Sequence, residues 1–78
     1  MKELSLDDFL DNGIIKEKDF RQKIKNFIWK KYSNKKVLIK GCASAPIPTW
    51  AYLIITCKLN DVNADIYFGE KCSAYKIN

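Results

Sequence analysis

The chain has 78 residues, of which 47% are hydrophobic, 13% are aromatic and 29% are charged, and its formal net charge is +5. This balance excludes an intrinsically disordered tail, because such segments lack apolar and aromatic residues. No apolar run approaches the ~18 residues of a membrane-spanning helix. A chain this short forms one small domain, residues 1–78, and buries only about 60% of the surface that its unfolded form exposes.

The positive charge comes almost entirely from lysine, since the sequence contains 13 lysines and one arginine. Proteins that read nucleic acids specifically rely on arginine for bidentate bonds to guanine and phosphate. We therefore expect no nucleic-acid partner, and we interpret the lysines as a solvated surface.

The first eight residues contain acidic side chains where a secretory signal has a basic segment followed by an apolar core. We therefore expect a cytoplasmic protein with reduced thiols, and three cysteines, an odd number, agree with this. The sequence contains no histidine, which removes the commonest general base, the Cys-His and Ser-His-Asp arrangements and the His-containing zinc sites. An enzyme is thus the least favoured class of function, and no residue is assigned a catalytic role.

In chain order, residues 1–13 are predicted to form an N-terminal arm that contains a short helix. Ser5 and Asp8 have the spacing of an approximate capping box, and Asn12-Gly13 is typical of a helix C-terminus. The rest of the chain, residues 14–78, is predicted to be a helix-strand-helix-strand unit.

Within this unit, residues 16–32 have apolar side chains at spacings of three and four, which predicts an amphipathic helix. Residues 35–41 are predicted to be a short buried strand bounded by lysine and glycine. A proline-led helix is expected over residues 49–60 and a second strand over residues 65–69. Residues 70–78 are a tail with, at most, a final extended piece.

The order α-α-β-α-β predicts an α/β fold in which two strands joined by a helix pair in parallel. A two-stranded sheet leaves both edges open and is seldom stable alone, and the helix over residues 49–60 is apolar around nearly its whole circumference. Both observations predict a homodimer that completes the sheet, whereas the alternative is a monomer covered by its first helices. The expected dimer or core contacts are Trp50, Tyr52, Ile54 and Ile55.

Cys42 and Cys72 each follow the carboxyl end of a predicted strand, so parallel pairing would place them at one edge of the sheet. Soft thiolates suit zinc, cuprous copper or an iron-sulfur cluster, which makes these two residues thiol or metal candidates. The competing interpretation is that they are small apolar residues at strand ends, because neither belongs to a Cys-x-x-Cys pair. Cys57, inside the apolar helix, is expected in the core. No metal ion or cofactor is assigned.

The junction between the first strand and the proline-led helix is a second candidate site. Free N–H groups at a helix N-terminus, together with the hydroxyls of Ser44 and Thr49, can bind phosphate, sulfate or carboxylate. Against this, the loop has no glycine after Gly41, and both hydroxyls are also common helix caps. An anion-binding or small-molecule-binding module is therefore an alternative function.

Four segments closely resemble the bacterial family called domain of unknown function 2480, and the resemblance spans nearly the whole chain. Its most specific parts are the Pro-x-Pro-x-x-Ala-Tyr pattern at residues 46–52 and the Tyr-Phe-Gly-Glu-x-Cys-Ser pattern at residues 67–73; the other two segments are residues 15–21 and 37–42. The resemblance implies a parent with two related halves, of which this chain is similar to one, and dimerisation would recreate the pair. Residues 74–78 depart from the proline-containing ending of the family.

The resemblance assigns no catalytic residue. Genes of the family often lie beside those for iron-sulfur cluster assembly, which implies an accessory role in iron-sulfur cluster or sulfur handling, with iron-sulfur assembly proteins as partners. A purely structural protein-protein interaction domain is the remaining alternative.

Overall fold

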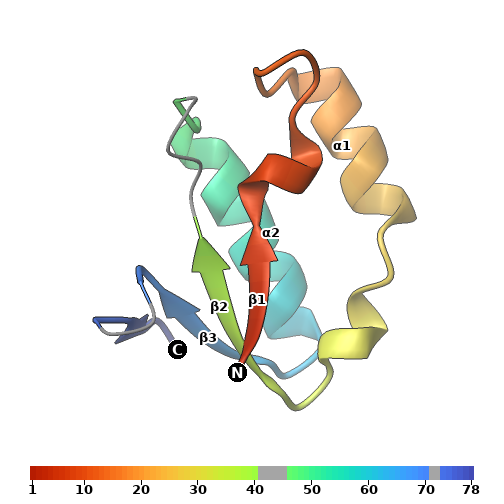
Figure 1. Ribbon diagram of the computed structural model, residues 1–78. Coiled ribbons are helices and arrows are strands. Elements are labelled where there is room, and N and C mark those ends of the chain that lie inside the picture. The colour runs from red at the N-terminus through yellow and green to blue at the C-terminus, as the bar shows by residue number, and fades with distance from the viewer. Residues whose placement is uncertain (41–45, 71–72) are drawn as a thin grey trace.

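The computed structural model describes residues 1–40, 46–70 and 73–78. The described chain folds into two layers, a four-stranded sheet and a pair of helices that cover one of its faces (Figure 1). Two short 3-10 helices, η1 (Leu6–Phe9) and η2 (Trp29–Tyr32), lie in the connections. The main elements are β1 (Lys2–Ser5), α1 (Glu17–Asn26), β2 (Lys36–Lys40), α2 (Thr49–Asp61), β3 (Asp65–Phe68) and β4 (Tyr75–Lys76).

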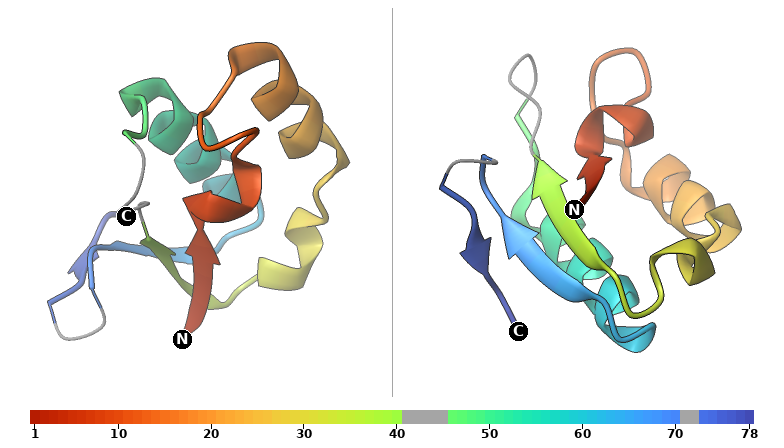
Figure 2. Two further views of the ribbon diagram at one scale, coloured as in Figure 1. Left: turned by 45° about the horizontal axis from the view of Figure 1, so that its top comes forward. Right: turned by 60° about the horizontal axis from the view of Figure 1, so that its bottom comes forward.

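The sheet has the order β1-β2-β3-β4, with β1, β2 and β3 parallel and β4 antiparallel to β3 (Figure 2). In this register Leu4 lies beside Ile39, and Val37 lies beside Ile66. The α/β class and the parallel pairing of the two central strands agree with the sequence. The prediction of a two-stranded sheet was wrong. The sheet has four strands, because β1 pairs with the outer edge of β2 and β4 pairs with the outer edge of β3.

The N-terminal arm is the largest departure from prediction, since it begins with a strand and not with a helix. Ser5 is the N-cap of η1, as expected, because its Oγ accepts a hydrogen bond from the Asp7 N–H at 3.2 Å. Asn12-Gly13 does not end a helix. Both residues have positive φ, 52° and 80°, and the flanking Asp11 and Ile14 exchange two backbone hydrogen bonds, so the pair forms a tight hairpin turn. Pairing with β2 gives β1 hydrogen-bond partners along one side and buries Leu4, which outweighs local helix signals.

The predicted helix over residues 16–32 is divided. The α-helix ends at Asn26, the chain continues extended through Phe27 and Ile28, and η2 follows. The indole Nε1 of Trp29 donates a hydrogen bond to the carbonyl oxygen of Ile24 at 3.0 Å, which satisfies one of the carbonyl groups that a helix C-terminus leaves unpaired. The three-residue and four-residue spacing of apolar residues persists across this break, so periodicity alone could not reveal it.

The C-terminal tail adds the fourth strand to the sheet. Besides forming β4, it ends in Asn78, whose Oδ1 accepts a hydrogen bond from the Ile66 N–H at 2.9 Å and whose Nδ2 donates to the Ala64 carbonyl at 2.9 Å. These bonds, together with the bond from the Ile77 N–H to the Ile66 carbonyl, hold the last residues against β3. The segment that departs from the family pattern thus has a structural role in this chain.

The hydrophobic core lies between the sheet and the two helices. The helix α2 contributes Ala51, Ile55 and Leu59, which recur every four residues and are fully buried. Rings of Phe9, Phe20 and Trp50 extend the core towards α1 and η1, with centroids 5.4–5.5 Å apart. Other core members are Leu4, Leu6, Ile24, Tyr32, Val37, Ile39, Ala64 and Ile66.

No helix among the described residues is long and apolar enough to cross a membrane.

The face of the sheet that no helix covers also has a buried residue. Leu38 lies at its centre and is fully buried, with Glu3 and Tyr67 as its register neighbours on β1 and β3. Glu3 forms an ion pair with Lys40 at 3.3 Å. This face therefore combines one buried leucine with charged groups.

Candidate functional site

The thiol site predicted from the sequence cannot be placed, because Cys42 and Cys72 lie outside the described residues. The strands that precede them do have the expected relationship. β2 and β3 are parallel neighbours, and Ile39 pairs with Phe68. The carboxyl ends of the two strands therefore lie side by side at the same end of the sheet (Figure 1). The thiol assignment stays a prediction.

The anion site predicted at the start of α2 is described only in part. Ser44 lies outside the described residues, whereas Thr49 is the first residue of α2 and is exposed. The N-cap residue is Pro48, which makes no side-chain capping bond. No acidic residue lies in the first turn. The anion site at this junction also stays a prediction.

The predicted contacts on α2 separate into two groups. Ile55 is fully buried in the core, while Trp50, Tyr52 and Ile54 are partly buried and pack against it. Cys57, expected in the core, is exposed. It lies two residues from both Ile55 and Leu59, about 200° around the helix from each, and so points away from the core. Among the described residues, no group of three or more cysteine or acidic side chains could hold a metal ion.

An apolar groove runs between α2 and β3 and has a volume of about 290 Å³. Across it, the rings of Tyr52 and Phe68 meet nearly at right angles, with centroids 5.3 Å apart and an interplanar angle of 87°. The hydroxyl of Thr56 donates a hydrogen bond to the Tyr52 carbonyl at 2.7 Å, so the hydrogen of this hydroxyl is already bonded within α2. We call this feature the α2–β3 groove, and it is lined by Ile39, Tyr52, Leu53, Thr56, Phe68 and Ile77.

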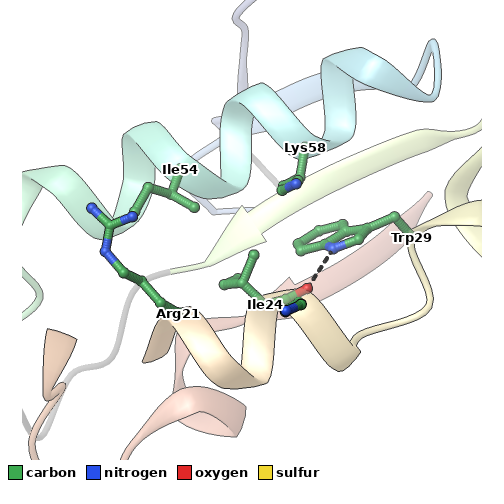
Figure 3. Close-up of a pocket in the computed structure, with 6 residues that line it drawn as sticks. Arg21, Ile24, Trp29, Ile54 and Lys58 are labelled. Carbon is green, nitrogen blue, oxygen red and sulfur yellow. Dashed lines mark hydrogen bonds between the residues drawn. The ribbon is translucent and has the colours of Figure 1, made fainter. Parts of the chain in front are cut away.

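A second pocket, also of about 290 Å³, lies between α1 and α2, and we call it the α1–α2 pocket (Figure 3). Arg21 lies at one end of it, and Lys58 and Trp29 lie at the other (Figure 3). Arg21 forms an exposed ion pair with Glu17 at 3.3 Å. In the described part of the chain, Lys25 and Lys58 have no acidic partner. The lining consists of Arg21, Ile24, Lys25, Trp29, Ile54 and Lys58.

Sequence reasoning missed both features. In the α1–α2 pocket, Arg21 and Lys25 are four residues apart, as are Ile54 and Lys58, so each pair lies on one face of its helix. That spacing was visible in the sequence, but it does not show which faces of two helices meet. In the α2–β3 groove, Leu53 and Ile77 are far apart in the chain, and only the packing of the tail beside α2 brings them together.

Tyr32 is the described residue whose ionisation the fold changes clearly. Burial raises the pKa of its phenol, and the negative charge of Asp8 raises it further. The ring of Tyr32 stacks on Phe27 with centroids 6.1 Å apart, and the Lys31 ammonium lies 5.3 Å from the Tyr32 ring centroid. With a raised pKa the phenol stays protonated at neutral pH, and its burial makes Tyr32 a core residue.

Comparison with known proteins supports the resemblance found in the sequence. A family model described as "Protein of unknown function (DUF2480)" matches residues 1–77. Comparisons with curated proteins and with solved structures gave no match. Because the family model covers essentially the whole chain, the chain belongs to the DUF2480 family.

Proposed function

We propose that the chain is a protein-interaction domain that pairs with a second copy of itself through the α2–β3 groove. The observation that carries this proposal is that none of the described residues lining the groove is charged, in a chain whose net charge is +5.

The apolar surface extends beyond the groove itself. Leu53 is 61% exposed and Ile77 is 50% exposed, while Phe68 retains 37% exposure despite its contact with Tyr52. Tyr75 is the register partner of Phe68 on β4, so its side chain lies on the same face, and it is 72% exposed. Contiguous apolar surface rimmed by polar residues marks an interaction site on a folded domain.

The absence of charge favours a second copy as the occupant. In a two-fold symmetric dimer the same patch faces itself, so a lysine in the patch would lie near its own symmetry mate. Four other surface pockets among the described residues each include at least one lysine. The α2–β3 groove therefore lets two copies meet without placing like charges together.

This proposal keeps the homodimer predicted from the sequence but changes its physical basis. The outer edges of β2 and β3 no longer require a second copy, because β1 and β4 pair with them. Among the predicted contacts, Ile55 belongs to the core and Tyr52 to the groove. The dimer thus rests on the exposed side of α2 and its neighbours on β3 and the tail.

The test compares the mass of the wild-type chain in solution with that of two matched variants. Leu53→Asp places a charge in the groove, and Ile28→Asp makes the same change at a residue that is 70% exposed and lies outside it. In a two-fold dimer each substitution acts twice. Losing the burial of two leucines, at about 1.5–3 kcal/mol each, weakens the dimer by roughly a hundredfold or more.

Analytical ultracentrifugation over a range of concentrations is the measurement. We expect a dimer for wild type and Ile28→Asp and a monomer for Leu53→Asp, with unchanged circular dichroism in all three. Added salt should leave the dimer intact or tighten it, because salt screens the repulsion between two positively charged copies. A wild-type monomer at high micromolar concentration, or equal weakening by both substitutions, contradicts the proposal.

The role in iron-sulfur cluster or sulfur handling is a separate proposal. It rests on Cys42, Cys72 and the family resemblance, and no contact among the described residues supports it. It is compatible with a dimer, since pairing of two chains would double the number of thiols.

A further inference from the structure

The α1–α2 pocket combines an apolar floor with a cationic rim, and we propose that it binds a small amphipathic anion, a carboxylate or phosphate group joined to a compact apolar body. This site differs from the α2–β3 groove, with which it shares no lining residue. It also differs from the predicted anion site at the start of α2.

The floor of the pocket is apolar and already positioned. Ile24 is 4% exposed, and Ile54 packs against the core from the opposite helix. The Trp29 indole is held by its bond to the Ile24 carbonyl at 3.0 Å and by contact with Phe27, whose ring centroid lies 4.6 Å away. Because its N–H is already bonded, the indole offers the pocket an apolar surface whose orientation is set before any ligand binds.

The rim of the pocket has cations on both sides. Arg21 and Lys25 are four residues apart and so lie on one face of α1. Lys58 comes from α2, one turn beyond Ile54 (Figure 3). None of the described residues that line the pocket is acidic. The ion pair of Arg21 with Glu17 joins two side chains that are both more than 60% exposed, so solvent screens it and a bound anion can replace it.

The two parts of the pocket select the same ligand. An inorganic anion would leave the floor of Ile24, Ile54 and Trp29 uncovered. A neutral apolar molecule would give the rim lysines, Lys25 and Lys58, no acidic partner. The volume of about 290 Å³ is at the lower end of the range for small-molecule sites. A short alkyl or single aromatic body with one anionic group satisfies the floor and the rim together.

The experiment uses octanoate, octyl phosphate and octanol, each below the concentration at which it aggregates. Isothermal titration calorimetry on the wild-type chain measures the affinity and the number of sites. In a Trp50→Phe background, Trp29 is the only tryptophan, and its fluorescence reports whether the ligand enters the pocket. We expect one saturable site for octanoate, octyl phosphate or both, a change in Trp29 emission, and at least tenfold weaker binding of octanol.

Two substitutions of equal charge locate the site. Lys58→Gln removes a rim cation, and Lys30→Gln removes an exposed lysine that does not line the pocket. Lys58→Gln should weaken anion binding about fivefold or more and leave octanol unaffected, whereas Lys30→Gln should have little effect. Leu53→Asp should leave anion binding unchanged, so failure of the dimer and failure of this site are distinguishable.

The relative affinities of octanoate and octyl phosphate identify which head group the site prefers. The inference is overturned if neither anion binds saturably at millimolar concentration, or if octanol binds as well as both anions. It is also overturned if Lys30→Gln weakens binding as much as Lys58→Gln, because the attraction would then be the net charge of the chain.

Discussion

The rings of Tyr52 and Phe68 join α2 to β3 across an otherwise open groove, with their centroids 5.3 Å apart and their planes nearly perpendicular. This edge-to-face contact joins the core to the exposed apolar surface, because Tyr52 packs against the core and Phe68 is 37% exposed. Tyr52 belongs to the helix whose sequence is apolar around nearly its whole circumference, and Phe68 ends β3 and belongs to the family pattern at residues 67–73.

Phe68→Ala should lower the free energy of unfolding by about 1–2 kcal/mol. The ring is only partly buried, so the loss is smaller than for a core phenylalanine, and about 0.5–1.5 kcal/mol of it is the aromatic contact. Urea denaturation at a concentration low enough to keep the chain monomeric measures the change. Tyr75→Ala is the control, since Tyr75 is 72% exposed, and it should stay within about 0.5 kcal/mol of wild type. Equal effects of the two substitutions would contradict the packing role of Phe68.

Leu4→Ala tests whether the N-terminal residues form part of the sheet. Leu4 is 2% exposed beside Ile39, so its truncation should cost about 2–5 kcal/mol. A domain of this size has a total stability of only about 4–12 kcal/mol, so the loss should be large in a thermal or urea melt. Leu53→Ala, at an exposed leucine, is the matched control. If Leu4→Ala were as mild as Leu53→Ala, β1 would not be packed as described.

The raised pKa of Tyr32 predicts a loss of stability at alkaline pH. Because burial and Asp8 raise the pKa of the folded-state phenol, the unfolded chain releases this proton first. The stabilising contribution is complete below the unfolded tyrosine pKa of about 10 and is lost as pH rises through the higher folded-state value. In denaturant melts from neutral to strongly alkaline pH, wild type should lose more stability than Tyr32→Phe. The lysines are the same in both chains, so their titration affects both equally. If wild type and Tyr32→Phe lost the same stability with rising pH, a contribution from Tyr32 would be ruled out.

The thiol prediction is tested by metal and labile-sulfide analysis of protein purified without oxygen. If Cys42 and Cys72 hold a metal ion or an iron-sulfur cluster, wild type should contain it stoichiometrically and Cys42→Ser should lose most of it, because a hydroxyl is a poor ligand for soft metals. Cys57→Ser is the control, since Cys57 is exposed on the side of α2 away from the core. Wild-type protein without stoichiometric metal, sulfide or persulfide would exclude this role.

Local sequence signals determined the central part of this protein. Lysines and a glycine bound a run of β-branched and aliphatic residues in β2, prolines precede α2, and turn residues separate α2 from β3, so these three elements were predicted to within two residues. The family membership was likewise readable from short residue patterns. Each of these signals depends on neighbours in the chain, which is why the sequence alone contained them.

Only the tertiary structure decided the edges of the sheet and the two candidate binding surfaces. The four residues of β1 contain one buried apolar side chain, and β4 has two residues, so neither has a strand pattern of its own. Both become strands because hydrogen bonds to distant residues satisfy their backbones. In the same way, Leu53 and Ile77 line one groove, and Arg21 and Lys58 line one pocket, through the packing of elements that are separated in sequence. The sequence by itself determined which segments are helical or extended at the centre of the fold; long-range pairing and burial decided which residues share a surface.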